Sequence, residues 1–485
     1  MAVMCMSLAA WAGHGDELSI DTLGRKVGMG EGQDSVLFSR IKRMGLQVLD
    51  IELVDGEWPT ADYVWAPSGS WGQGIQNATK VPGRMRIFDR DSVIYDTGEY
   101  VDSVSGMTLK IRGNSTAWYD KKPYKIKLQK KADLLQRDTI DGRDKNWILI
   151  RDEVLKTMMG FEVNRALGMT WTPGYRYVNV VINNRYEGVY MLVEQVRRNT
   201  DCRLNVSKQG YIFECDPYWW NEPLYLPSLL FSHFGYTFKY PEPEDFTAAD
   251  STYMTGLLSN MDCSYIRDNY PEVIDVPSYA AWCLGHDILG TKDFAGANQY
   301  FLKYDKSDTT RVVMPLLWDF DSAEGDTATW SQPHIQLMYY LFRNPNKAFV
   351  NAFVDKWNSV QPTLYETIYA KFEKMRHSKE GTAFSLSMQL NNQRWGTTFM
   401  IYSNFVYRPE WIRKRVIWLT REIAKLSPVD GDIDLNGKVD VADVNMLINM
   451  ILEQIEPQQA VADLNGDGLI DVADLDLLIR ILIAE

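Results

Sequence analysis

The chain has 485 residues, of which 45% are apolar and 24% are charged. This composition is that of a globular protein, so wholesale disorder and collagen-like repeats are excluded, and the length predicts two to four domains. The net charge of −13 excludes a protein that coats nucleic-acid phosphates, because such a protein needs a basic face. Residues 430–485 carry 13 acidic and 2 basic side chains, so we expect a nearly neutral body with a small, strongly acidic tail.

The N-terminus is apolar and uncharged over residues 1–12, and Ala10-Trp11-Ala12 fits a small-x-small cleavage site. We interpret residues 1–12 as the remnant of a signal peptide; a buried N-terminal strand is the alternative. No run of 18 apolar residues exists, so no membrane-spanning helix is expected. After export, Cys202 and Cys215 either form a disulfide or remain as two buried thiols.

Residues 13–95 are rich in turns and short β-like runs, and they predict a β-rich N-terminal region. Residues 109–128 then predict a strand, a loop and a second strand. In that second strand apolar residues alternate with Lys125 and Lys127, so both lysines are expected on one face.

A helix is predicted over residues 152–167, with Asp152 as its N-cap and Gly168 as its C-terminal stop. Glu162 lies within the apolar stripe of this helix. A β-hairpin follows, with Asn183-Asn184 as its turn. From about residue 245 onward the pattern is mostly helical, which predicts a β-rich lobe followed by a helical lobe.

The helical part contains a group of polar residues that suits phosphoryl transfer. Asp293 and Asn298 are five residues apart in a loop-like stretch, and an apolar strand then ends in Asp319 and Asp321. Protein kinases use an Asp to accept the substrate hydroxyl proton, an Asn and a second Asp to bind Mg²⁺, and a strand lysine paired with a helix glutamate to hold phosphates. Each feature alone has an ordinary alternative: a chance Asp-x4-Asn, a turn cap, an interfacial glutamate or a solvated strand face.

In combination, these motifs resemble the CotH family of spore-coat-type atypical protein kinases. The segments that carry the resemblance are 112–116, 121–128, 186–195 and 318–321, together with Asp293 and Asn298. The resemblance implies an α+β, divergent protein-kinase-like, two-lobed fold over residues 96–425. It also implies that the protein uses ATP, with Mg²⁺ or Mn²⁺, to phosphorylate Ser or Thr of secreted proteins.

The same resemblance implies a role for each site residue. Asp293 is the catalytic base, Asn298 and Asp319 hold the metal, and Asp321 assists. The nucleotide site is implied to comprise Lys125 or Lys127 on the phosphates, Glu162 paired with that lysine, Glu194 near the nucleotide, and Arg112.

The acidic tail contains two similar twelve-residue loops, 432–443 and 463–474, spaced 31 residues apart. Each loop has oxygen-bearing side chains at positions 1, 3, 5, 9 and 12 and Gly at position 6, which suits Ca²⁺, a hard ion that takes six to eight oxygens. Position 7 offers its carbonyl group. A merely solvated acidic run does not explain the repeated register. The predicted ligands are Asp432, Asp434, Asn436, Lys438, Asp440 and Asp443 in the first loop, and Asp463, Asn465, Asp467, Leu469, Asp471 and Asp474 in the second.

An apolar helix follows each loop, and each loop ends in Asp rather than Glu. These duplicated loop-helix units resemble the type I dockerin family, which implies a small all-α domain over residues 432–485 after a linker at 426–431. The resemblance implies two bound Ca²⁺ ions and a cohesin partner on another protein, recognised through Val441, Ala442, Val472 and Ala473. It also implies a secreted or cell-surface location in a bacterium.

We therefore predict a secreted CotH-like protein kinase tethered through a calcium-dependent dockerin module. One alternative is a dockerin-bearing carbohydrate-active enzyme, since the chain has 16 Trp and 26 Tyr and since Asp293, Asp319 and Glu324 could include an acid and a nucleophile. Another is a non-catalytic, kinase-like binding module. The five histidines are scattered and no HExxH motif occurs, which disfavours a zinc hydrolase.

Overall fold

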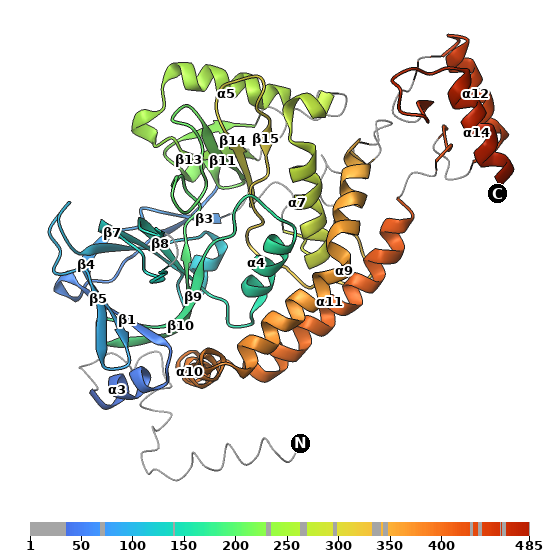
Figure 1. Cartoon of the computed structure of the whole chain (residues 1–485). Helices are drawn as coiled ribbons and strands as arrows, with labels where there is room; N and C mark the ends of the chain where they lie inside the picture. The colour runs from blue at the N-terminus through green and yellow to red at the C-terminus, as the bar shows by residue number, and fades with distance from the viewer. Residues whose placement is uncertain are drawn as a thin grey trace, which may run out of the picture.

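The protein is described by a computed structural model. The described residues are 35–67, 73–138, 141–228, 234–261, 269–293, 298–331, 341–342, 348–426, 430–434, 439–455, 457 and 462–484. The fold is mixed α+β, with a β-rich N-terminal part and a helical C-terminal part (Figure 1). The predicted signal peptide, residues 1–12, lies outside the described residues. Among the residues described, no helix combines the length and the apolar character needed to span a membrane.

The larger sheet has eight strands in the order β1-β9-β10-β8-β7-β6-β4-β5. β1 pairs with both β9 and β4, so all of these strands except β5 form a closed barrel around an apolar core. The predicted boundary at residue 95 therefore falls within one sheet. The strands β1 and β4, which precede it, form one barrel with the strands that follow it. The strands are β1 (Gln47–Leu53), β4 (Val81–Asp89), β5 (Ser92–Asp96), β6 (Met107–Ile111), β7 (Tyr124–Ala132), β8 (Asp144–Ile150), β9 (Tyr175–Ile182) and β10 (Arg185–Glu194).

The hairpin predicted around Asn183-Asn184 is present between β9 and β10. Ile182 pairs with Arg185 across the turn, and the two asparagines have φ angles of 47° and 62°. Asparagine tolerates this left-handed backbone, which a two-residue hairpin turn requires. The hairpin prediction is therefore confirmed.

The predicted helix at 152–167 is present as α4 (Lys156–Ala166). The Asp152 carboxylate caps its first turn from upstream, because it accepts hydrogen bonds from the backbone N–H groups of Thr157 at 2.9 Å and Met158 at 3.2 Å. Gly168 follows the helix with a φ of 65°, as expected of a C-terminal stop. Helix α4 contacts both α7 and α9.

The C-terminal part combines a five-stranded sheet, in the order β12-β13-β11-β14-β15, with helices that share one large apolar core with α4 (Figure 1). Its strands are β11 (Tyr211–Asp216), β12 (Tyr225–Pro227), β13 (Gly235–Tyr240), β14 (Gln299–Lys303) and β15 (Val312–Val313). Its helices are α5 (Ala248–Asn260), α7 (Val276–Leu289), α9 (Ala348–His377), α10 (Lys379–Trp395) and α11 (Ile401–Ala424). The remaining elements of the body are α3 (Ser35–Arg43), η1 (Val54–Gly56), β2 (Asp62–Trp65), β3 (Gln73–Gln76), η2 (Ser115–Trp118), η3 (Trp219–Asn221) and η4 (Pro243–Asp245).

The acidic tail contributes α12 (Val441–Ile451) and α14 (Val472–Ala484), which contact each other. Their apolar faces bury a small separate core. Its buried members are Ile433, Leu447, Met450, Ala462 and Leu478. The predicted helix after each loop is therefore confirmed.

Candidate active site and calcium loops

A cavity of about 1180 Å³ is lined from both sheets. The barrel contributes side chains of β6, β7 and β8, and the smaller sheet contributes side chains of β11, β13 and β14. Representative lining residues are Lys110, Lys125 and Ile148 from the barrel, and Glu214, Lys239 and Tyr300 from the smaller sheet.

Four predicted site residues line this cavity together: Asp293, Asn298, Asp319 and Asp321. The Asn298 amide donates a hydrogen bond to the Asp293 carbonyl at 3.1 Å, and the Asp293 N–H donates to Ser322 Oγ at 3.2 Å. Asn298 and Asp319 have φ angles of 58° and 62°. Left-handed backbone is unusual outside glycine and concentrates at functional sites, so the chain holds this group in a specific arrangement.

The carboxylates of this group repel one another. Burial, aided by the charges of Asp321 and Asp293, raises the pKa of Asp319 to about 7, although Arg112 opposes the shift. Burial and Asp321 likewise raise the pKa of Asp293. A cation would relieve this repulsion, and carboxylate and amide oxygens are ligands that suit Mg²⁺ or Mn²⁺. The residues present therefore fit a divalent metal.

A basic group lines the same cavity. Burial, followed by the charges of Arg197, Lys110 and Lys239, lowers the pKa of Lys125 to about 7. Lys127 is exposed and is not among the described residues that line the cavity. The two lysines share one face of β7, as predicted, but only Lys125 reaches the cavity. An anion beside Lys125 would restore its charge, so this group fits phosphate.

Two of the predicted nucleotide residues lie elsewhere. The Glu162 carboxylate forms ion pairs with Arg165 at 2.6 Å and Lys371 at 3.5 Å, and Glu162 is not among the described lining residues. The predicted pair between Glu162 and the strand lysine is therefore wrong: the residue points from α4 toward α9 rather than toward β7.

Glu194 is buried at the end of β10. Its carboxylate pairs with Arg137 at 2.9 Å and accepts a hydrogen bond from the Gly174 N–H at 2.8 Å. The next two residues, Gln195 and Val196, line the cavity instead. The segment was correctly placed beside the cavity, but the side chain predicted to face the nucleotide is turned away from it.

Sequence reasoning missed a polar network on the smaller sheet. Glu214 forms an ion pair with Lys239 at 2.8 Å and also interacts with Tyr300. Burial lowers the pKa of Lys239, but Glu214 and other nearby acids outweigh it, and the pKa is raised. Burial also raises the pKa of Asp216 to about 7. In the sequence, the network is marked only by the spacing of Glu214 and Asp216, which lie two residues apart on one strand. Many strands with a solvated face show the same spacing of acidic residues, so it did not indicate a site.

Of the three carboxylates named for the carbohydrate-enzyme alternative, Asp293 and Asp319 line the cavity together and Glu324 does not. Glu324 forms an ion pair with Arg408 and is not among the described residues lining the cavity. The predicted disulfide alternative is also not formed. Cys202 and Cys215 are thiols, the first partly buried and the second buried.

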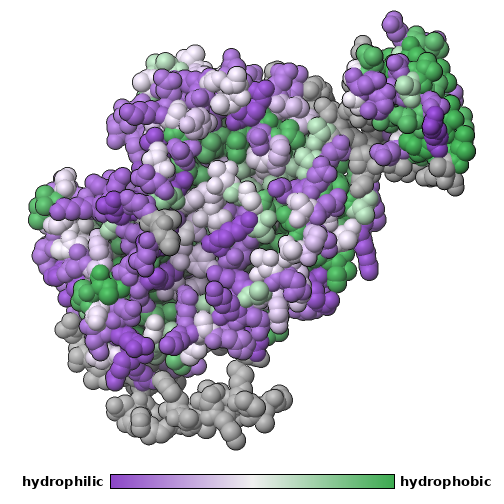
Figure 2. Space-filling model, viewed as in Figure 1, coloured by the Kyte–Doolittle hydropathy of each residue, from purple (hydrophilic) through white to green (hydrophobic). Residues whose placement is uncertain are grey.

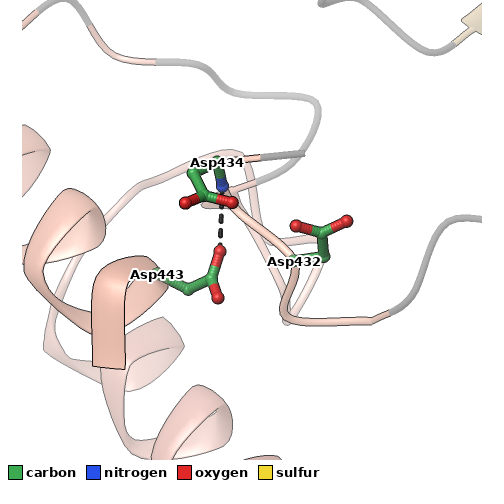
Figure 3. A group of neighbouring side chains, drawn as sticks. All are labelled: Asp432, Asp434 and Asp443. Atoms are coloured by element: carbon green, nitrogen blue, oxygen red, sulfur yellow. Dashed lines mark hydrogen bonds between the residues drawn. The ribbon is translucent and has the colours of Figure 1, made fainter. Parts of the chain in front are cut away.

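The first acidic loop brings three predicted calcium ligands together (Figure 3). Carboxylate oxygens of Asp432, Asp434 and Asp443 all lie within 4.8 Å of one another. The Asp443 carboxylate also accepts hydrogen bonds from the N–H groups of Asp434 at 2.9 Å and Asp440 at 2.8 Å. Asn436 and Lys438 lie outside the described residues. This convergence of carboxylates fits Ca²⁺.

The second loop repeats these bonds at equivalent positions. Asp474 accepts hydrogen bonds from the N–H groups of Asn465 at 3.1 Å and Asp471 at 2.9 Å. Asp463 accepts from three further loop N–H groups, and Asp467 accepts from the Leu469 N–H at 2.9 Å. Both loops are therefore closed by the Asp at position 12, which is fully buried in each case.

The family model described as CotH kinase protein matches residues 109–403, which is more than half of the chain. The chain belongs to the CotH kinase protein family. A second model, the dockerin type I domain, matches residues 430–483, so this CotH protein carries a dockerin module at its C-terminus. Dockerin domains bind calcium and cohesin modules and occur in extracellular proteins. Both family predictions are confirmed.

A solved structure similar to this CotH protein is that of the proinflammatory kinase CtkA of Helicobacter pylori. The identity is 11% and the TM-score is 0.23, over 61% of this chain and 95% of CtkA. No curated protein sequence matches the chain.

The dockerin module presents its predicted recognition residues to solvent. Val441 and Ala442 begin α12, Val472 and Ala473 begin α14, and all four are exposed. Figure 2 shows apolar residues gathered on the visible face of this tail. The two pairs occupy equivalent positions of the two repeats, so the module offers the same small apolar contact twice.

Proposed function

We propose that this CotH protein is a secreted protein kinase with a divergent two-lobed kinase fold. It transfers a phosphoryl group from ATP to Ser or Thr of exported proteins, with Mg²⁺ or Mn²⁺. The main support for this proposal is that one cavity is lined both by Lys125 and by four polar residues, which are Asp293, Asn298, Asp319 and Asp321. Phosphoryl transfer needs such a combination, because its catalysis consists mainly of positioning and of neutralising charge on phosphate oxygens.

Asn298, Asp319 and Asp321 would hold the metal. The bound metal and ATP together supply the activated phosphoryl group and offset its negative charge. Lys125 binds phosphate oxygens and is recharged by them, since burial and neighbouring cations have lowered its pKa to about 7. Arg112 lines the same cavity, and its charge opposes the rise in the pKa of Asp319, so it lies close enough to favour the charged carboxylate.

Asp293 would accept the proton of the substrate hydroxyl. Its backbone N–H donates to Ser322 Oγ and its carbonyl accepts from the Asn298 amide, which fixes the backbone of Asp293. The side chain lines the cavity, where a substrate hydroxyl can reach it. Its raised pKa also makes it a better proton acceptor than an ordinary aspartate. The dockerin module would tether this domain to a cohesin module on another secreted protein, and a polysaccharide-degrading assembly is one setting for such a tether.

A second candidate is a kinase-like module that binds ligands without transferring phosphate. The observation that favours it is the absence of a Glu162–Lys125 pair, because active kinases require the corresponding ion pair. The two candidates differ in a single measurable property, which is phosphoryl transfer by the unmodified chain.

The test is label incorporation from ATP, with Mg²⁺ or Mn²⁺, into the chain and into a panel of exported proteins. We expect incorporation by the parent and a loss of roughly 10²–10⁴-fold in Asp293→Asn, because an amide cannot accept the proton. Asp308→Asn, an exposed site away from the cavity lining, is the matched control and should match the parent.

No incorporation by the parent with either metal would favour the binding module. Undiminished incorporation by Asp293→Asn would show that Asp293 is not the base. A parallel glycan-hydrolysis screen tests the carbohydrate-enzyme alternative, and retention on immobilised type I cohesins with and without chelator tests the tether.

A further inference from the structure

A second cavity, of about 260 Å³, lies on another face of α4. Five segments line it: the loop after β7, α4, the start of β9, the end of α9 and the start of α10. Four of its lining side chains are cationic, whereas the lining carboxylate, Glu380, is exposed at the rim. The cationic residues are Arg137, Arg165, Arg176 and Lys371. We call this space the α4 pocket.

The cations of the α4 pocket are only partly neutralised. Arg165 and Lys371 share the single carboxylate of Glu162, at 2.6 Å and 3.5 Å. Arg176 donates a hydrogen bond to the carbonyl of Leu135 at 2.8 Å, which supplies no negative charge. Arg137 is already paired with Asp133 and Glu194, both at 2.9 Å. The other three cations, from three different elements, face one cavity against the buried Glu162 and the exposed Glu380, and an anion is the ligand that such an excess of cations favours.

Tyr175 is an independent sign of a missing ligand. It lines the pocket, and among the described residues its buried hydroxyl has no hydrogen-bond partner. Leaving a buried hydroxyl unpaired is destabilising, so such groups are rare in proteins. Arg165 and Lys371 lie 6.0 Å and 5.6 Å from the centre of its ring. A ligand oxygen that met these cations could also accept a hydrogen bond from the Tyr175 hydroxyl.

We propose that the α4 pocket binds one phosphate group, either free or carried on a phosphorylated side chain. The planar fork of arginine matches tetrahedral oxyanions, and a dianion balances the uncompensated cations better than a single carboxylate does. The volume is below the roughly 300–1,000 Å³ of sites for drug-sized ligands, so the pocket suits a phosphate rather than a nucleotide.

A hydrogen bond and a series of aromatic contacts link the α4 pocket to the large cavity. Tyr177 lines the pocket, and its hydroxyl donates a hydrogen bond at 2.6 Å to Asp152, the carboxylate that caps α4. The Tyr175 ring lies 5.6 Å from that of Phe161, which in turn lies 5.6 Å from that of Phe320. Phe320 stands between the two aspartates of the predicted metal site. Bound phosphate therefore supports the position of α4 beside that site; this catalytic consequence rests on the proposed function, but phosphate binding does not.

The test measures the phosphate affinity of the full chain by calorimetry, with inorganic phosphate and with O-phosphoserine as separate probes. The chain is loaded with calcium, and excess calcium is removed before the measurement. Arg165→Gln combined with Lys371→Gln should weaken binding at least tenfold. Tyr175→Phe should weaken it severalfold without lowering the melting temperature, since only an unpaired hydroxyl is lost. Lys374→Gln, an exposed cation on α9 that does not line the pocket, is the matched control and should retain the binding.

Weakened binding in either pocket variant, with retention in Lys374→Gln, supports the proposal. Tighter binding of O-phosphoserine than of inorganic phosphate identifies a phosphorylated side chain as the occupant, and the reverse identifies free phosphate. The proposal is overturned if the parent binds neither probe or if both pocket variants bind like the parent. It is also overturned if Lys125→Gln, in the large cavity, loses binding while both pocket variants keep it, because the phosphate site is then the large cavity.

Discussion

Asp319→Asn should stabilise the metal-free protein at high pH, because burial and two neighbouring carboxylates disfavour the charge of Asp319. Its pKa is raised from 3.8 to about 7 in the folded chain. A carboxyl group with a raised folded-state pKa binds more protons when folded, so the free energy of unfolding falls as pH rises from about 4 to about 7 and is constant above. At 1.36 kcal/mol per pKa unit, the penalty carried by the parent at pH 8 is at most about 4 kcal/mol.

The assay is urea unfolding of parent and Asp319→Asn at pH 5 and pH 8, with two equivalents of Ca²⁺ for the dockerin module and no Mg²⁺. We expect the gain in unfolding free energy on substitution to be larger at pH 8 than at pH 5, and Asp308→Asn to show no such pH dependence. Added Mg²⁺ should stabilise the parent more than the variant, because the metal compensates a charge that the variant lacks. A substitution effect that is equal at both pH values would refute the electrostatic reasoning.

Three other outcomes are expected. Asp443→Ala should abolish the calcium-dependent unfolding transition of the dockerin module, measured by calorimetry. It removes a predicted calcium ligand and two hydrogen bonds to a buried carboxylate, and the two bonds together contribute about 3 kcal/mol. An unchanged transition would contradict this. Lys125→Gln should raise the dissociation constant of Mg·ATP at least tenfold. It should also remove the loss of Mg·ATP affinity that the parent shows as pH rises from 6 to 8. Lys127→Gln, at an exposed position, should bind Mg·ATP within twofold of the parent, and equal losses in both variants would exclude a specific role for Lys125. Glu162→Gln should leave Mg·ATP affinity within twofold, since its partners are Arg165 and Lys371, and a tenfold loss would restore the kinase-type pair.

Local patterns predicted the local features of this chain well. The hairpin turn at Asn183-Asn184, the stop at Gly168 and the two loop-helix repeats depend on residues close together in sequence. Each of these carries its own stereochemical requirement, such as a left-handed backbone or a ring of loop oxygens. The positions of Asp293 and Asn298 were predictable for the same reason, since one short loop holds both.

Features that depend on distant packing could not be read from the sequence. Helix α4 is buried on several sides, so its apolar pattern did not reveal whether Glu162 faces β7 or α9. The closure of the barrel joins β1 to β9 across more than a hundred residues, so the boundary near residue 95 looked like a division between regions. Lys239 and Glu214 gave no signal, because a charged residue on a strand is ordinarily solvated and only the folded sheet brings this pair together.

The opposite pKa shifts in the large cavity constrain what it is built to bind. Burial raises the pKa of Asp319 and lowers that of Lys125, so the free cavity disfavours both a negative charge and a positive charge within the same space. A simple cation would relieve only the acidic group, and a simple anion only the basic group. A ligand that carries a metal ion on a polyphosphate relieves both, and the stabilisation of each group then adds to binding. A neutral polysaccharide offers neither charge, so these opposite shifts support the proposed metal–nucleotide ligand over the carbohydrate-enzyme alternative.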